Sequence, residues 1–356
     1  MEISRRSMLK TTALGAFALS QGGRFAAAQT AGGAAIEPED RVFIANEDSN
    51  TVSVIDPRSN TVETTINLTS FDEDPRPPFR FVTGGAVPTH AAMINKPLYH
   101  GAIAIHGVVP SPDGRLLATS GRGTSNVYLI DTVARRVVGN RPNPQASATT
   151  NAERLTSGIL VGREPHEPTF TPFQKTSPDG NEVWLSHKLA DRVSAVETHE
   201  AFRVLDSVPL GNLARPNHLE FVQNARGKAI YVSLARVDDG GPGDVASSQI
   251  AIIDHSAPPG LRKVVGSFFT RGREAHGLWT NPSNTLLYVA HEQDELPGAP
   301  AAGQTVASAF DVSNPFAPAF VAQIPLGSLK LPSGELRNKK SINLVYVRPG
   351  TKGQTA

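Results

Sequence analysis

Short apolar runs with period-two alternation recur along most of the chain, and no segment carries an apolar stripe at helical spacing. Glycine, proline, asparagine and aspartate bound these runs, which is typical of strands joined by tight turns. One type of run occurs five times, at 42–46, 116–120, 183–187, 230–234 and 287–291. The pattern therefore predicts an all-β chain.

Two further runs follow each of these five. The second runs end in an acidic residue and lie at 52–56, 127–131, 193–197, 250–254 and 307–311. The third runs close the unit and lie at 61–68, 155–161, 202–210, 264–269 and 320–326. Together with a histidine-bearing run that comes first, each unit has four antiparallel strands, as in the blades of a β-propeller.

The histidine-bearing run opens four of the units, with His106, His166, His218 and His276 near its start. In three of them an arginine stands three residues earlier, namely Arg163, Arg215 and Arg273. The first unit lacks a run of this first type. Residues 341–347 form such a run, but no second or third run comes after it. We expect this last strand to pair with the first unit, which would close a ring and remove its open edges.

The segment Asn50-Thr51-Val52-Ser53-Val54-Ile55-Asp56, the Pro-Asp-Gly turns at 112–114 and 178–180, and the Gly-Arg-x-Pro-His entry at 162–166 resemble the YVTN family of β-propeller repeats. The resemblance covers most of the chain and implies a propeller domain, predicted here for residues 41–350 with a tail at 351–356. Family members usually have seven blades, but five units are readable. Residues 69–101 and 139–154 look like insertions.

The N-terminus predicts export. Ser4-Arg5-Arg6-Ser7-Met8-Leu9-Lys10 is typical of a twin-arginine signal, a short apolar run follows it, and Ala26-Ala27-Ala28 suits a signal peptidase. We expect residues 1–28 to be removed, 29–40 to form a flexible leader, and the mature protein to be periplasmic or secreted. The apolar run is too short to cross a bilayer, so no membrane span is expected.

Composition narrows the chemistry further. The 356 residues include no cysteine, which excludes iron–sulfur clusters and the attachment of a c-type haem. Without residues 1–28 the chain carries 30 basic and 32 acidic residues. This near-neutral balance, with no basic run, argues against nucleic acid as a partner.

Blade topology predicts where chemistry would lie. The first strand of a blade lines the channel and the second returns beside it, so the start of one and the end of the other share a face. Six histidines would then meet at one mouth: His106, His166, His187, His218, His276 and His291. Several neutral imidazoles suit copper or zinc. Hydrogen bonds that hold blades in register, or acid–base use without metal, remain alternatives.

The arginines predict a ligand. Arg163, Arg215 and Arg273 would ring the same face, and their planar donors suit carboxylate or phosphate. Glu164 and Glu274 lie beside them and complete the candidate ligand-binding set, and mutual salt bridges between blades are the alternative. The loops 238–248 and 295–304 are expected to crown this face, whereas His199 and His255 are expected in solvated outer loops.

Two functions remain open from the sequence. The first is a non-enzymatic exported scaffold that binds a small ligand or a periplasmic protein at the histidine-lined face. The alternative is a copper- or zinc-dependent oxidoreductase, or a lactonase-like hydrolase, at the same face. Lactonase-like propellers share this style of repeat, so the resemblance fits both, and no Gly-x-Ser-x-Gly or His-Glu-x-x-His motif decides between them.

Overall fold

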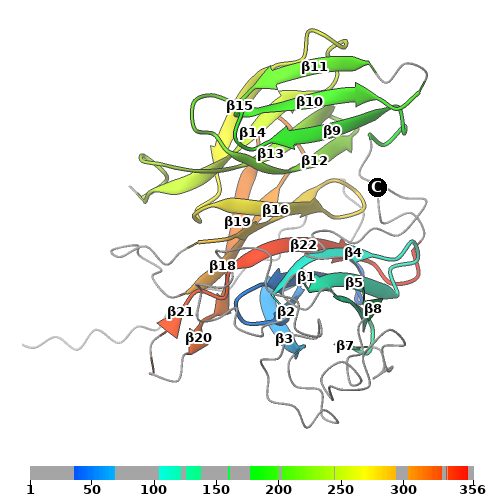
Figure 1. Ribbon diagram of the computed structural model, residues 1–356, viewed down its shortest axis with the longest axis vertical. Helices are drawn as coiled ribbons and strands as arrows, with labels where there is room; N and C mark the ends of the chain where they lie inside the picture. Colours follow the sequence, from blue (N-terminus) through cyan, green and yellow to red (C-terminus); the bar gives the residue numbers. More distant parts are fainter. Residues whose placement is uncertain are drawn as a thin grey trace, which may run out of the picture.

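The computed structural model describes residues 36–68, 104–121, 126–137, 159–160, 177–199, 203–243, 245–293, 304–330, 334 and 336–351. This part of the chain is all β, with antiparallel strands in five sheets and one small ribbon (Figure 1). It contains no helix with the length and apolar character that a membrane crossing needs. The predicted export signal, residues 1–28, lies outside the described residues.

Three of the sheets have the four strands that the apolar runs predict. The first contains, in order, β22 (Ser341–Val347), β1 (Arg41–Asn46), β2 (Thr51–Asp56) and β3 (Thr61–Asn67). The fourth contains β12 (Pro216–Asn224), β13 (Gly227–Asp238), β14 (Ser247–Asp254) and β15 (Val264–Phe269). The fifth contains β16 (Ala275–Thr280), β17 (Leu286–His291), β18 (Thr305–Asp311) and β19 (Ala319–Gly327). The expected all-β organisation is confirmed.

The second and third sheets depart from the simple unit. The second contains β4 (Ile105–Pro110), β5 (Leu116–Gly121), β6 (Asn126–Asp131), β7 (Arg136–Val137) and β8 (Ile159–Leu160). Its closing strand, expected at 155–161, is split, because β7 and β8 pair with opposite ends of β6. The third contains β9 (Glu182–His187), β10 (Arg192–Glu197) and β11 (Val204–Pro209). A ribbon, β20 (Leu329–Lys330) with β21 (Leu336–Arg337), was not expected.

The sheets follow one another in a propeller-like arrangement. The first strands of successive sheets, here called the inner strands β12, β16, β22 and β4, pack side by side in that order, and β9 lies against β12 (Figure 1). The last strand, β22, pairs antiparallel with β1 and so completes the first sheet, as the sequence predicts.

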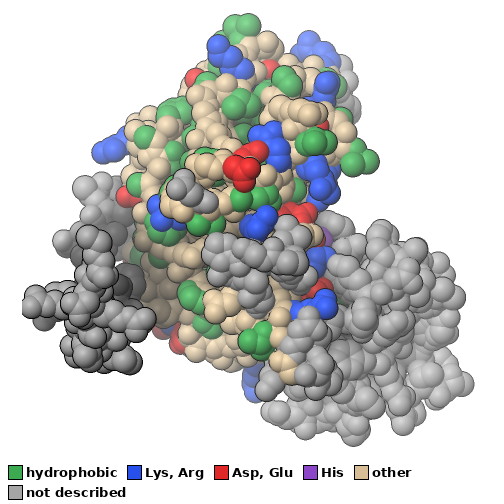
Figure 2. Space-filling view, turned by 90° about the vertical axis from the view of Figure 1, so that its left-hand side faces the viewer, with side chains coloured by type: hydrophobic (Ala, Val, Ile, Leu, Met, Phe, Trp, Pro, Cys, Tyr) green, Lys and Arg blue, Asp and Glu red, His purple; other side chains and the backbone are tan. Residues whose placement is uncertain are grey.

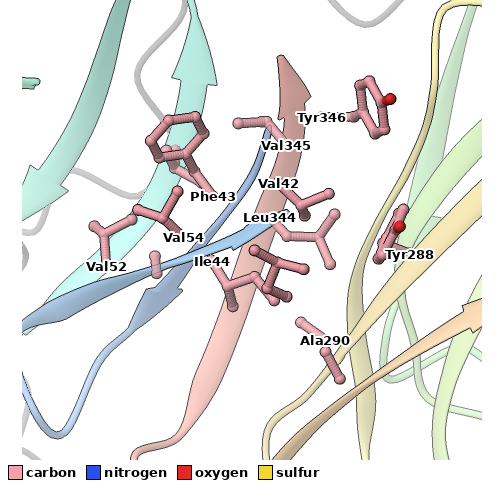
Figure 3. Close-up of a cluster of buried hydrophobic side chains, with 14 of the residues drawn as sticks. Val42, Phe43, Ile44, Val52, Val54, Tyr288, Ala290, Leu344, Val345 and Tyr346 are labelled. Carbon is pink, nitrogen blue, oxygen red and sulfur yellow. The ribbon is translucent and has the colours of Figure 1, made fainter. Parts of the chain in front are cut away.

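Alternating side chains fill the spaces between sheets. Along β1, Val42 and Ile44 lie on one face and Phe43 on the other, and all three are fully buried. Figure 3 shows Phe43 directed away from Tyr288 and Ala290 of the fifth sheet, toward which Leu344 of β22 points. In the first sheet β22, β1 and β2 are thus buried on both faces, whereas β3 is largely exposed. Two further clusters join the third to the fourth sheet and the fourth to the fifth. Such burial between sheets supplies most of the free energy that holds this architecture.

The turns and strand ends follow the local chemistry expected for them. In the turn after β4, the Ser111 hydroxyl donates to Asp113 at 2.7 Å and accepts from the backbone NH of Leu116 at 3.0 Å. Acidic residues at the ends of the second runs accept from backbone NH groups two residues on, at Asp56, Asp131, Asp254 and Asp311. These carboxylates therefore cap the turns that follow the strands.

The predicted flexible leader ends before Asp40. Of residues 29–40 the structure describes 36–40, and Asp40 is fully buried. Its carboxylate accepts from the Tyr346 hydroxyl at 2.6 Å and from Arg348 Nε at 2.8 Å. The residue just before β1 is thus hydrogen-bonded to Tyr346 of β22 and to Arg348, which follows β22. These bonds connect the two ends of the described fold.

The expectation that His255 is solvated is wrong. Its side chain is 11% exposed, and its Nε2 lies 3.0 Å from a Glu182 oxygen. The Trp184 and Phe221 rings flank it at 6.1 Å and 5.4 Å between centroids. These partners belong to two different sheets, so the sequence around residue 255 does not predict them.

Candidate functional site

Each inner strand begins with the same backbone conformation. The residue immediately before it, here called the entry residue, has a left-handed backbone with φ between 49° and 59°. A register shift follows within the first residues of the strand, and such a bulge re-aims the side chains beside it. The entry residues of β4, β12, β16 and β22 are Ala104, Arg215, Glu274 and Lys340. Because the conformation recurs, it belongs to the fold, and only the side chains distinguish the four sheets.

This register corrects the alignment that sequence spacing suggests. Spacing aligns Arg215 with Arg273, but the structure places Arg215 and Glu274 at the same entry position. His218 consequently lies one residue farther along its strand than His276 does. The two histidines therefore come from successive positions of neighbouring strands rather than from equivalent ones.

Three of the predicted histidines form a row across the inner strands. His276 lies between the other two, with its ring centroid 4.8 Å from that of His218 and 5.8 Å from that of His106. The His276–His106 contact is edge-on, with an interplanar angle of 86°. His106 and His276 are buried, and His218 is half-buried. The structure thus joins side chains that are far apart in the sequence, as blade topology predicts.

A lysine and two carboxylates lie beside this histidine row. Lys340 Nζ is 2.8 Å from Glu47 Oε2 and 3.2 Å from Glu292 Oε1. His106 Nδ1 is 3.8 Å from Glu47, and His276 Nε2 is 3.8 Å from Glu292. One ammonium group therefore bridges two carboxylates, each next to an imidazole.

His276 is held neutral. Burial lowers its pKa to about 3, with smaller contributions from the nearby cationic groups, and the Glu292 carboxylate opposes this shift only in part. Its Nδ1 is buried and has no hydrogen-bond partner. A neutral imidazole with an unused nitrogen retains its capacity to accept or donate one hydrogen bond.

The predicted metal set is only partly assembled. The structure brings together His106, His218 and His276, but no group of three or more His, Asp or Glu within the described ranges is arranged to hold a metal ion. His166, together with Arg163 and Glu164 from the predicted ligand-binding set, lies outside the described residues.

His187 and His291 have local partners apart from the row. His187 Nε2 is 3.0 Å from the hydroxyl of Ser194 on the neighbouring strand β10. His291 is fully buried, with Nδ1 3.2 Å from the Val306 carbonyl oxygen, to which it donates. Burial lowers the pKa of His291 to about 4, and the bond to Val306 counteracts this shift. Of the six predicted histidines, the described residues therefore bring His106, His218 and His276 together in one row.

The His291 ring leaves no room for a side chain at Gly272. A Cβ on Gly272 would lie 2.3 Å from His291 Cδ2, so Gly272→Ala should lower the free energy of unfolding by about 1–3 kcal/mol, the usual cost of overpacking. Urea unfolding would measure the change. Gly266→Ala is the matched control, because its Cβ would meet only Ile252 Cδ1 at 3.9 Å. Equal losses in both variants would contradict the proposed contact.

A cavity of about 330 Å³ lies at the entry residues Arg215 and Glu274 of β12 and β16, the two strands that carry His218 and His276. Its polar lining comes from Arg215, Arg236, Arg273, Glu274 and Gln293, and Leu213 and Val237 contribute apolar surface. We call it the arginine cavity. The end of β13 forms one wall of this cavity. The strand continues to Asp238, which still pairs with Ser247 of β14 before the loop 239–246. In Figure 2, Lys and Arg side chains form a broken column down one face, interrupted by acidic patches.

Two of the three arginines have no acidic partner. Arg236 Nε lies 2.7 Å from Asp238, and its Nη1 donates to the Asn212 carbonyl oxygen at 2.7 Å. Arg215 and Arg273 make no salt bridge with any described residue, and Arg273 Nε is buried without a hydrogen-bond partner. Salt bridges between blades, the alternative from the sequence, thus do not account for these two side chains in the described structure.

Glu274 stands out among the acidic groups of the cavity. Burial, followed by repulsion from Glu292, raises its pKa to about 7, although Lys188, Arg215 and Lys340 counteract the shift. For Glu292 burial acts in the same direction, but the positive groups around it, the bonded Lys340 ammonium among them, outweigh burial and lower the pKa of that carboxyl. The pKa values of two neighbouring carboxyl groups are thereby shifted in opposite directions, which is a frequent property of functional sites.

Sequence reasoning missed Arg236, Glu47 and Lys340. Lys340 had a recoverable signal, since it precedes the last strand just as Glu274 precedes β16. Arg236 and Glu47 had none, because their place depends on how far β13 extends and on how the turn after β1 meets the last strand.

No protein-family model and no curated protein matches this sequence. Similar solved structures include hydrazine synthase of Kuenenia stuttgartiensis, with 15% identity, a TM-score of 0.32, and coverage of 81% of this chain and 63% of that one. A putative 6-phosphogluconolactonase from Bacteroides uniformis has 14% identity and a TM-score of 0.34, over 86% and 71% of the two chains. A functionally unknown protein from Desulfotomaculum acetoxidans has 13% identity and a TM-score of 0.45, over 87% and 99%. This chain spans less than two thirds of the hydrazine synthase chain.

Proposed function

We propose that this protein is an exported propeller of the YVTN kind, with a ring closed by β22, that binds a small anionic ligand in the arginine cavity. The observation that supports the ligand class is the pair Arg215 and Arg273, which line one hollow without a carboxylate partner among the described residues. Guanidinium groups bind carboxylate and phosphate through two parallel hydrogen bonds.

The size of the cavity favours a small molecule over a protein partner. Its volume of about 330 Å³ falls at the lower end of the range typical of small-ligand sites. Leu213 and Val237 add apolar surface beside the arginines, which suits the carbon skeleton of a small ligand. A ligand with one or two anionic groups and a short carbon skeleton matches this lining.

A direct test uses binding calorimetry with sulfate, inorganic phosphate, succinate and citrate. We expect at least one of these anions to bind, and Arg273→Gln to weaken that binding by about 10-fold to 100-fold, the usual value of a charge-assisted hydrogen bond. Arg226→Gln is the matched control, because Arg226 is exposed in the turn between β12 and β13, at the opposite end of both strands. Absence of binding, or equal losses in the two variants, would overturn the proposal.

The histidine row supports a second candidate, a histidine-dependent reaction with or without copper or zinc. Its supporting observation is the neutral His276 imidazole, packed against His218 and two residues from Glu274 in the cavity wall. Elemental analysis of protein purified from its native host would test the metal-dependent form. Copper or zinc near one equivalent, lost in His276→Ala, would support it, and metal-free protein would contradict it.

A further inference from the structure

The segment that leads from β11 to β12, residues 211–215, contributes Leu213 and Arg215 to the lining of the arginine cavity, and we call it the strap. Its backbone is unusual, because both of these residues are left-handed, with φ of 55° and 49°. Arg215 shares this conformation with the other entry residues, whereas Leu213 lies two residues earlier. A bulky residue is rarely left-handed, since its Cβ crowds the backbone, and such strain persists only where the surroundings impose it.

Asp191, in the turn between β9 and β10, holds the strap from the side of the third sheet. One of its carboxylate oxygens accepts from the backbone NH of Leu213 and the other from the backbone NH of Arg215, each at 2.8 Å. Its carbonyl oxygen accepts from the backbone NH of Leu210, just before the strap, at 2.9 Å. The two left-handed residues are thus the ones that this carboxylate binds.

Strand β13 of the fourth sheet holds the other side of the strap. The Arg236 side chain donates from Nη1 to the Asn212 carbonyl oxygen at 2.7 Å. The backbone NH of Arg236 donates to the Ala214 carbonyl oxygen at 3.4 Å. Because the Arg236 guanidinium already carries a bond within the cavity wall, Arg215 and Arg273 are the arginines that are left for a ligand.

This anchoring decides which strap side chain enters the core and which faces the cavity. Ala214 is fully buried in the cluster between the third and fourth sheets, whereas Leu213 is 62% exposed. Leu213 lines the arginine cavity together with Val237 and Arg215. A single exposed leucine is common on protein surfaces, but this one is held in a strained conformation two residues from a cation that lines the same cavity. It therefore offers apolar surface to a ligand whose anionic group Arg215 binds.

We propose that the arginine cavity binds a short aliphatic monocarboxylate, with Leu213 in contact with its carbon chain and with Asp191 as the residue that positions the strap. This inference rests on the proposed anion-binding function. One carboxylate has two oxygens, so it can accept from both Arg215 and Arg273. Leu213 and Val237 then cover the chain, and a volume of about 330 Å³ leaves room for several carbon atoms.

Titration calorimetry with sodium acetate, propionate, butyrate and valerate, at constant ionic strength, tests the ligand class. We expect the dissociation constant to fall about twofold to fourfold for each added methylene, the usual effect of burying one such group. In Leu213→Asn the total gain from acetate to valerate should shrink by about fivefold. Asparagine suits this position, because it tolerates a left-handed backbone and offers little apolar surface. Leu261→Asn is the matched control, since Leu261 is 70% exposed at the opposite end of the fourth sheet and should keep the native dependence.

Asp191→Ala tests the positioning role. It should weaken the binding of acetate and valerate alike by about fivefold to tenfold, because Arg215 is no longer held at the cavity. The loss of a negative charge would by itself strengthen anion binding, so weaker binding reports the lost position. Asp191→Asn, which keeps one acceptor oxygen, should recover part of the affinity. A purely structural role would lower the free energy of unfolding in urea and leave the dissociation constants of the folded protein unchanged.

The outcomes separate this inference from the proposed function. Carboxylate binding that Arg273→Gln weakens, but that does not depend on chain length, would refute the inference and leave anion binding intact. The same holds if Leu213→Asn and Leu261→Asn keep the same dependence, or if Asp191→Ala binds as tightly as the unmodified protein. If neither these carboxylates nor the other anions bind, the proposed function itself fails, and the inference fails with it.

Discussion

Replacing Glu182 with alanine is expected to lower the free energy of unfolding by about 3–5 kcal/mol, the usual loss when one partner of a buried ion pair is removed. Glu182 begins β9, and its carboxylate accepts from Arg262 Nη2 at 2.7 Å and from the Trp184 indole at 2.9 Å. Arg262 is 6% exposed, and its Nη1 also lies 3.1 Å from Asp206. Without Glu182, the guanidinium and the His255 ring would lose their shared acceptor inside the protein.

This Glu182 network joins the third sheet to the loop that follows β14 of the fourth. Arg262 lies over the Trp184 ring, with Cζ 5.8 Å from its centroid, and its Nε donates to the Ala257 carbonyl oxygen at 3.1 Å. Burial acts to raise the pKa of Glu182, but the bonds from Arg262, Trp184 and His255 outweigh it and lower that pKa. The stabilisation is thus complete above the unfolded value of about 4.5 and is lost as the pH falls through the folded pKa.

Equilibrium urea unfolding at pH 7, followed by both circular dichroism and tryptophan fluorescence, would measure the loss. The matched control is Glu197→Ala, which breaks an exposed bond from Arg203 to Glu197 in the same sheet and should change stability little. Glu182→Gln should fall between alanine and the native residue, because an amide oxygen still accepts. A Glu182→Ala protein as stable as the control variant would show that the network does not hold the two sheets together.

Local patterns predict the sheets well, and the reason is physical. β1 and β22 are buried on both faces, so they read as nearly continuous apolar runs, and a short run of this kind between turn residues directly indicates a strand. Turn chemistry is equally local, since the Ser111 hydroxyl bonds to Asp113 and to Leu116, two and five residues away. These features need no knowledge of the rest of the molecule.

The candidate site was only partly predictable, because it depends on register and on distant partners. Spacing from an arginine aligned His218 with His276, but the bulges set the two one residue apart. Arg236 reaches the arginine cavity because β13 continues past the start of β12 while it stays paired with β14, and no sequence motif predicts that length. His255 looked solvated, because Glu182 is 73 residues away in the sequence.

Acid is expected to destabilise the protein steeply between about pH 6.5 and pH 4, through the buried neutral rings of His276 and His291. Their pKa values in the folded chain are lowered to about 3 and about 4, whereas an unfolded histidine titrates near 6.5. The unfolded state therefore binds more protons in this interval, and stability falls as the pH falls. Each ring contributes a slope of about 1.4 kcal/mol per pH unit, so the pair should remove on the order of 5 kcal/mol by pH 4.5.

His291→Phe separates this effect from ordinary packing. Phenylalanine keeps a ring beside Gly272 but cannot be protonated, and it leaves the Val306 carbonyl oxygen without its donor. The variant should be less stable at pH 7.5 by about 1–3 kcal/mol, and its urea-unfolding free energy should converge with that of the native chain as the pH falls to 4.5. His199→Gln, at an exposed turn position, is the control and should keep the native slope. Parallel curves for the native protein and His291→Phe across this range would mean that the buried ring is not the group that takes up the proton on unfolding.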